Sequence, residues 1–139
     1  MKRMILLIFI LFSLKAFAPS EKVMYILRSQ SEISRPYEKI WRAVVAVESG
    51  GDPYVVGDMH LKSHSYGVVQ IRKVRMDDYN ARTGNSYSHS DAFDVEVSKR
   101  IFMFYAHRIG PYDTDYLIRK WNGSGKKTYD YLNKVKAKL

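Results

Sequence analysis

The chain has 139 residues and no cysteine, and its 23 Lys and Arg residues outnumber its 14 Asp and Glu residues to give a formal net charge of +9. This length suits one globular domain and leaves no room for two. The lack of cysteine excludes disulfide bonds, thiolate metal sites and cysteine nucleophiles. The basic balance favours anionic partners such as cell wall, nucleic acid or acidic lipid, although a merely soluble surface can have the same composition.

Residues 1–18 have the pattern of a secretory signal peptide. Lys2 and Arg3 precede an apolar run over residues 4–14, and Ala16-Phe17-Ala18 forms a small-x-small cleavage site. The run is short for a membrane span, but an uncleaved anchor is the alternative, because a lysine stands just before the cleavage site. Removal of the signal takes away three cations and no acid, which lowers the net charge to +6. We therefore expect an exported protein of the periplasm or cell envelope, for which nucleic acid is not an expected partner.

A polar, serine-rich stretch over residues 19–35 predicts either a linker or an N-terminal helix. Pro36 then suits the first position of a helix. Apolar residues recur at helical spacing after it, and the helix should end at Gly50-Gly51. The stripe consists of Tyr37, Ile40, Trp41, Val44 and Val45, with Glu48 as its last member.

Four more helices are predicted in the rest of the chain, so the expected fold is mainly α, with one domain over residues 36–139. A loop over residues 52–66 comes first, and the pattern between Gly51 and Gly67 also admits a short β-hairpin. Glycines and prolines then separate the helical segments. The predicted helices cover residues 69–82, 94–108, 114–121 and 128–138.

Glu48 is the residue with the strongest chemical implication. As the last member of an apolar stripe, its carboxyl should face the core side at the C-terminal end of a helix. Apolar surroundings and the negative end of the helix dipole both disfavour the ionised form. A carboxyl that stays protonated near neutral pH can donate its proton to a leaving oxygen. The alternative is a glutamate at a helix boundary whose side chain turns to solvent.

Three short motifs follow one another along the chain. Residues 41–53 end a helix in Glu-Ser and turn through small residues to a proline. Residues 65–71 read Ser-Tyr-Gly-Val-Val-Gln-Ile, and residues 121–124 read Trp-Asn-Gly-Ser, with Thr-Tyr-Asp-Tyr-Leu-Asn-Lys-Val at 128–135. In this order they resemble the Glu-Ser, Ser-x-Gly-Leu-Met-Gln-Ile, Tyr-Asn-Ala-Gly and Thr-Tyr-Val-x-Lys-Val segments of the lytic transglycosylases. The resemblance spans residues 36–135.

The resemblance implies a lysozyme-like helical domain that cleaves the β-1,4 bond between N-acetylmuramic acid and N-acetylglucosamine in peptidoglycan. Glu48 would protonate the leaving oxygen and then serve as base while the muramic acid's own 6-hydroxyl attacks C1, giving a 1,6-anhydro sugar. No second carboxylate, metal or cofactor is required. Glycan strands are the implied partner of a monomeric enzyme, and association with an envelope-spanning machine or a virion follows by analogy. The resemblance also implies substrate-binding roles for Ser49, Ser65, Gly67, Gln70, Trp121 and Asn122.

Two departures from the family pattern leave other functions open. The loop between Glu48 and Gln70 looks longer than usual, and Trp121 stands where the family usually has a tyrosine that is held to act near the reacting sugar. That change favours a non-catalytic peptidoglycan-binding component, whereas the retained Glu48 argues against one. A hydrolytic muramidase would need a second carboxylate. Asp52 and Asp58 are the candidates, although Asp52 also fits a simple turn before a proline.

Two further polar clusters have simpler interpretations. His60 and His64 are four residues apart in the predicted loop and lack a clear third ligand, so we expect no metal site. Arg72, Lys73 and Arg75 form a basic cluster that is typical of a solvated helix face and could also touch carboxylates of the wall.

Overall fold

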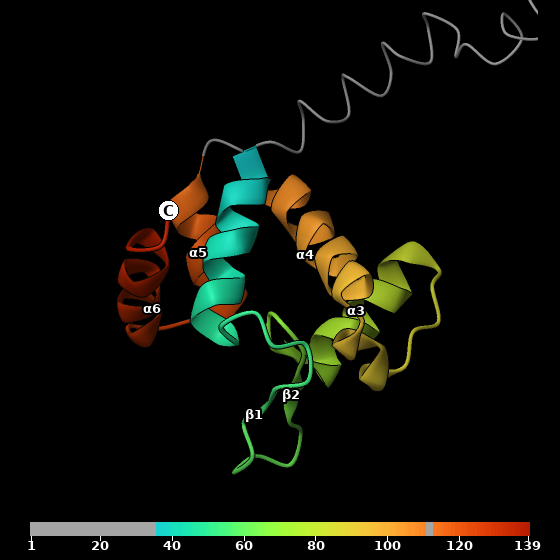
Figure 1. Ribbon diagram of the computed structural model, residues 1–139. Helices are drawn as coiled ribbons and strands as arrows, with labels where there is room; N and C mark the ends of the chain where they lie inside the picture. Colours follow the sequence, from blue (N-terminus) through green and yellow to red (C-terminus); the bar gives the residue numbers. More distant parts are fainter. Residues whose placement is uncertain (1–35, 111–112) are drawn as a thin grey trace, which may run out of the picture. The chain divides into compact units, whose positions relative to one another are not determined.

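The computed structural model describes residues 36–110 and 113–139, which belong to a compact unit over residues 34–139 (Figure 1). The predicted signal peptide and the predicted linker or N-terminal helix lie outside the described residues. The expected mainly α class is confirmed within them. No helix in the described part of the chain is long and apolar enough to cross a membrane.

Helices account for most of this unit, and each predicted helix is present with small differences at its ends. The first covers residues 36–48. A short 3-10 helix, η1, was not predicted; it begins in a capping box made by Ser88 and Asp91. In chain order, the helices after the first are α3 (Lys73–Thr83), η1 (His89–Phe93), α4 (Val95–Ile109), α5 (Thr114–Asn122) and α6 (Lys127–Lys136).

Side-chain caps explain where two of these helices begin. The Asp94 carboxylate accepts hydrogen bonds from the backbone N–H groups of Glu96 and Val97 at the start of α4. The Asp113 carboxylate accepts one from the N–H of Tyr116 at the start of α5. Both aspartates satisfy donors that the first turn of a helix leaves without an intrahelical partner.

A three-stranded antiparallel sheet lies between the first helix and α3. The hairpin expected between residues 51 and 67 is present as β1 (Val56–Gly57) and β2 (Ser65–Tyr66), with Val56 opposite Tyr66. A third strand, β3 (Ile71–Arg72), pairs with β2. The predicted start of the next helix at residue 69 was therefore wrong, because residues 71–72 pair in the sheet and the left-handed backbone of Gln70 (φ 53°) interrupts any helix before them.

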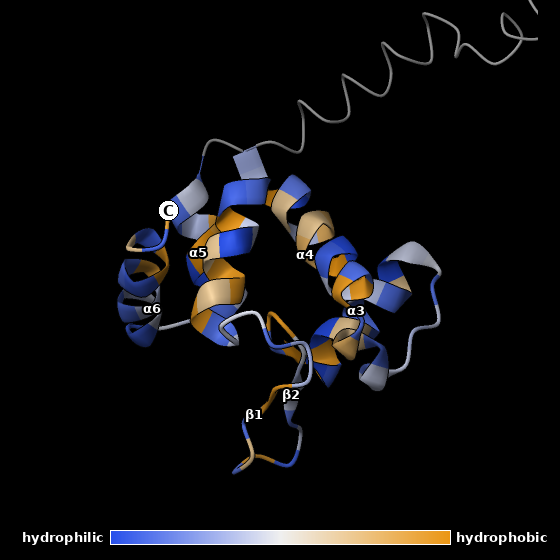
Figure 2. Cartoon of the chain, viewed as in Figure 1, coloured by the Kyte–Doolittle hydropathy of each residue, from blue (hydrophilic) through white to orange (hydrophobic). Residues whose placement is uncertain are grey.

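The core forms where the first helix, α4 and α5 meet. Figure 2 shows hydrophobic and hydrophilic residues alternating along these helices, and the buried hydrophobic ones form the core. The Phe102 ring of α4 contacts Trp41 of the first helix and Trp121 of α5, at centroid distances of 5.4 and 4.9 Å. Outside the core, Lys99 and Glu38 form an ion pair of 3.0 Å that joins α4 to the first helix. The C-terminal end of the first helix, which carries Glu48, is thereby held on a packed framework.

Candidate active site

Glu48 lies in the last turn of the helix over residues 36–48, at the end of a buried stripe. Tyr37, Ile40, Trp41 and Val44 of that stripe are each no more than 6 % exposed, whereas Glu48 is only half-buried. The chain then turns through two glycines with left-handed backbone, Gly50 and Gly51. The sequence predicted a carboxyl that faces the core side at the end of this helix; in the structure the Glu48 side chain is half-buried.

A phenol from the other end of the sequence meets this carboxyl. The Tyr131 hydroxyl of α6 donates a hydrogen bond of 2.7 Å to Oε1 of Glu48. Burial raises the pKa of Glu48 above its usual 4.5, and the charge of Asp58 adds a smaller rise. The Tyr131 hydrogen bond and the charge of Arg75 act in the opposite direction, but the net effect is a raised pKa. The carboxyl therefore has the electrostatic surroundings that a general acid needs.

Tyr131→Phe is expected to raise the pKa of Glu48 further. The phenol donates to the carboxylate form, so its removal disfavours ionisation while the surrounding burial stays the same. The measurement is a carbon-13 NMR titration of the Glu48 carboxyl in both proteins. Tyr129→Phe is the matched control, since Tyr129 is two residues away on α6 and half-exposed. A Tyr131→Phe midpoint at or below that of the wild type would contradict this electrostatic account.

Ser49 fixes the end of the Glu48 helix to the neighbouring loop. Its hydroxyl is 2.9 Å from the carbonyl oxygen of Val68 and 3.2 Å from that of Val45, and it accepts from the backbone N–H of Gly51. The predicted substrate-binding hydroxyl is thus used within the protein. In the described structure Ser49 sets the position of the helix end, and so of Glu48.

Ser65 and Gln70 form a second bracing network, inside the small sheet. The Ser65 hydroxyl donates to Oε1 of Gln70 at 2.8 Å, and Nε2 of Gln70 donates to the carbonyls of Val55 and Gly67 at 3.2 and 2.9 Å. A Cβ on Gly57 would lie 2.0 Å from Oε1 of Gln70, so a larger residue there would force the Gln70 amide out of this network. Both polar side chains hold the loop between β1 and β3 in one conformation.

Gly67 belongs to the same loop and is buried against η1. A Cβ at this position would lie 1.9 Å from the carbonyl oxygen of Ala92, and the backbone φ of Gly67 is +78°. The absence of a side chain thus makes room for the η1 backbone. The structure gives this residue of the second motif a packing role that explains its identity without a ligand.

Trp121 is a core residue with one face toward a pocket. It is 5 % exposed, and its indole N–H donates to the carbonyl of Val69 at 3.1 Å. Asn122, which follows it at the end of α5, is exposed. Ser49 and Trp121 therefore bond to adjacent carbonyls, those of Val68 and Val69, which brings the Glu48 helix and the end of α5 to the same segment.

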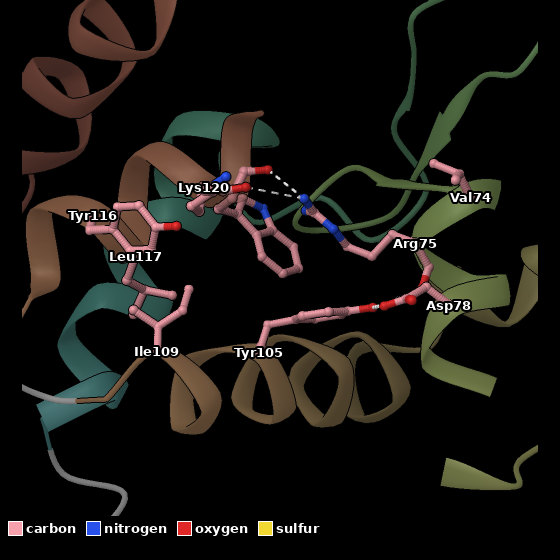
Figure 3. A pocket seen from close by; sticks show the side chains of 9 residues that line it. Val74, Arg75, Asp78, Tyr105, Ile109, Tyr116, Leu117 and Lys120 are labelled. Carbon is pink, nitrogen blue, oxygen red and sulfur yellow. Dashed lines mark hydrogen bonds between the residues drawn. The ribbon is translucent and has the colours of Figure 1, made fainter. Parts of the chain in front are cut away.

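Arg75 of α3 packs against Trp121. Its Nη2 donates to the carbonyl of Trp121 at 2.8 Å and more weakly to that of Lys120 at 3.4 Å. The guanidinium carbon lies 4.0 Å from the centroid of the Trp121 ring and 5.7 Å from that of Tyr105. Figure 3 shows Arg75 reaching across the top of the pocket, with the Tyr105 ring on the opposite side and its hydroxyl at Asp78.

A pocket of about 350 Å³ opens beside these residues, between α3, α4 and α5 (Figure 3). Its lining combines aromatic rings and aliphatic side chains with a few polar groups, a combination typical of sites for small organic ligands or sugar rings. Burial and the hydrogen bond to Asp78 raise the pKa of Tyr105 on its floor, so this hydroxyl stays protonated at neutral pH. The lining residues are Val74, Arg75, Asp78, Tyr105, Ile109, Tyr116, Leu117, Lys120 and Trp121.

The two candidate second carboxylates differ in their relation to Glu48. Asp52 is exposed and accepts a hydrogen bond from the backbone N–H of Tyr54 at 2.9 Å, as the turn interpretation predicts. Asp58 has a positive φ of 54°, lies 3.8 Å from Arg72, and its charge acts on Glu48. Only Asp58 is electrostatically coupled to the candidate acid.

Sequence reasoning did not single out Tyr131 or Arg75 for this site. Tyr131 is inside the quoted segment at residues 128–135, and its helical spacing of three from Thr128 and four from Val135, both buried, marks it as facing the core. The sequence predicts Arg75 on one solvated basic face with Arg72 and Lys73. No sequence signal shows that it points the opposite way.

Searches against protein families, curated proteins and solved structures found no match for this chain.

Proposed function

We propose that this protein is an exported peptidoglycan lytic transglycosylase with a lysozyme-like fold and Glu48 as its general acid and base. The observation that carries the proposal is the half-buried carboxyl at the end of the first helix, with a raised pKa and a phenol hydrogen bond from α6. The order of the three motifs supports the same class. The small sheet between the Glu48 helix and α3 is compatible with it.

In the proposed reaction the Glu48 carboxyl gives its proton to the oxygen that links C1 of N-acetylmuramic acid to N-acetylglucosamine. The C1–O bond breaks through an oxocarbenium-like state. The oxygen of the muramic acid's 6-hydroxyl then bonds to C1, and the Glu48 carboxylate takes the hydroxyl proton. Glu48 ends protonated as it began, no water is consumed, and the new chain end is a 1,6-anhydro sugar.

A pocket lined by Trp121, Tyr105 and apolar side chains supports a glycan as substrate, since sugar rings pack on aromatic faces. Glu48 is not among its lining residues, but Arg75, which lines the pocket, acts electrostatically on Glu48. The net positive charge favours docking on an anionic wall. We further propose that the enzyme acts as a monomer in the periplasm or envelope, alone or as the wall-opening part of a larger machine or virion.

Mass spectrometry of the products from purified peptidoglycan tests the proposal. The protein without residues 1–18 should release muropeptides with 1,6-anhydro ends. Reducing ends would instead indicate the hydrolytic muramidase, the second candidate, which the electrostatic coupling of Asp58 to Glu48 favours. Binding to the wall without any products would indicate a non-catalytic component.

Asp58→Asn is expected to leave most of the activity and to lower the pKa of Glu48. The substrate's own hydroxyl replaces a second carboxylate, and the lost negative charge had been raising the pKa of Glu48. The alkaline limb of the pH–rate profile should consequently move to lower pH. Asp52→Asn, whose carboxylate only closes a turn, is the control and should leave both rate and profile unchanged. Loss of cleavage in a folded Asp58→Asn protein would favour the hydrolase.

A further inference from the structure

Arg75 differs from the other cations at the start and along the length of α3. Lys73 and Arg82 each form an ion pair with an aspartate four residues away on the same helix, at 2.7 and 2.8 Å. Arg75 forms no ion pair with any carboxylate in residues 36–110 or 113–139. Instead it is half-buried, bonded to backbone carbonyls and stacked on Trp121.

Hydrogen bonds to two adjacent carbonyls connect the surroundings of Arg75 with those of Glu48. The indole on which Arg75 stacks is tied to the carbonyl of Val69, and Ser49, the residue next to Glu48, is tied to the carbonyl of Val68. The guanidinium is thereby fixed in direction, because the Trp121 carbonyl and the ring together hold its plane. A cation so anchored costs no reorganisation when a negative charge forms nearby.

We propose that Arg75 is a positioning residue whose anchored guanidinium is the counter-charge for the carboxylate that Glu48 becomes when it gives up its proton. This inference rests on the proposed function. A direct ion pair between Arg75 and Glu48 would keep the carboxyl ionised, and an ionised carboxyl has no proton to transfer. A cation beyond ion-pair distance leaves the carboxyl protonated before the reaction and stabilises the anion that the first step forms.

The other charged and titratable groups that act on Glu48 are Tyr131 of α6 and Asp58 after β1. Asp58 is itself paired with Arg72 at 3.8 Å, which offsets part of its charge. Among the described residues, Arg75 is the cation whose charge lowers the pKa of Glu48. Burial is the largest influence on this pKa and raises it. Burial also lowers the pKa of Arg75, but an arginine remains cationic at neutral pH.

The test is a carbon-13 NMR titration of the Glu48 carboxyl in glutamate-labelled protein, with the signal assigned by its loss in Glu48→Gln. Arg75→Gln should raise the midpoint of the titration, while Arg75→Lys, which retains a charge, should stay nearer to the wild type. Arg82→Gln is the matched control. It removes from the same helix a charge that is paired with Asp78, and it should leave the Glu48 midpoint unchanged. Arg75→Met, which preserves the apolar stem over Trp121, replaces Arg75→Gln if the latter does not fold.

On peptidoglycan, Arg75→Gln should move the alkaline limb of the pH–rate profile to higher pH and lower kcat about tenfold, with a smaller change in KM. A folded Arg75→Gln or Arg75→Met protein in which Glu48 titrates with the wild-type midpoint would overturn the inference. So would a Glu48 midpoint in Arg75→Lys that is raised as far as in Arg75→Gln. The titration needs no substrate. If the wild-type protein cleaves no peptidoglycan, the proposed function fails while the titration still decides the role of Arg75 as counter-charge.

Discussion

Glu48→Gln is expected to reduce peptidoglycan cleavage by about 10²–10⁴-fold, the usual contribution of a general acid. Glutamine has the shape of the carboxyl and can still accept the Tyr131 hydrogen bond, but it has no acidic proton to transfer and cannot serve as base. Release of anhydro-muropeptides by equal amounts of folded protein gives the measurement. Glu38→Gln is the matched control on the same helix, where Glu38 forms ion pairs with Arg42 and Lys99. Near wild-type turnover by Glu48→Gln would remove the central proposal.

The same substitution should have a pH-dependent effect on stability. The pKa of Glu48 is raised in the folded protein, so the folded state binds this proton more tightly than the unfolded chain does. The stability that protonated Glu48 contributes is fully present below the ordinary glutamate pKa of 4.5. It is lost as the pH rises through the raised pKa that Glu48 has in the folded protein. The uncharged glutamine avoids that loss. The free energy of unfolding of Glu48→Gln minus that of the wild type should therefore increase as pH rises, as thermal melts across this range can measure.

Trp121→Ala should lower the free energy of unfolding by about 3–5 kcal/mol, the typical cost of truncating a buried Trp. The ring contacts Phe102, its N–H satisfies the Val69 carbonyl, and its face holds Arg75. Trp121→Phe preserves most of the apolar ring but leaves the Val69 carbonyl without its donor, so we expect a smaller loss of about 1–3 kcal/mol. Urea denaturation of the three proteins measures both values.

Tyr129→Ala is the matched control, because Tyr129 is an aromatic residue of α6 that is 52 % exposed. Its loss should cost under about 1 kcal/mol, since only a surface contact with Arg119 disappears. A loss for Trp121→Ala no greater than that of Tyr129→Ala would contradict the packing described here. Rates per folded molecule then separate two roles for Trp121: an unchanged rate means support of the fold only, and a reduced rate means contact with the substrate.

The sequence could locate Glu48 because helical periodicity is a local property. Residues 37–48 lie on one helix, so spacing places a carboxyl at the end of an apolar stripe. The Glu-Ser motif, which is also local, then singled out Glu48 as the candidate acid. The partners of that carboxyl could not be found in this way. Tyr131 is 83 positions away along the chain, and only the packing of α6 beside the end of the first helix brings its hydroxyl to Glu48.

The polar residues of the motifs show the same limit. Ser49, Ser65 and Gln70 were expected at the substrate, and their identity and order were readable from the sequence. Their hydrogen bonds depend on the conformation of the loop between the first helix and α3. In the structure, Ser49 and Gln70 bond to backbone carbonyls, and Ser65 bonds to Gln70. Their predicted roles in substrate binding stay predictions.

By itself, the sequence determined the mainly α class and the positions of the helices within a few residues, because both depend on periodicity and on glycine and proline breaks within one segment. It also indicated Glu48 as the candidate acid, through the apolar stripe that ends there and the short motifs around it. Only the tertiary structure decided that Trp121 is buried, that Tyr131 donates to Glu48, and that Arg75 turns from the basic face of α3 toward an indole. These last features depend on which helices pack together, and a side chain's direction across such an interface is set by partners far away in the chain.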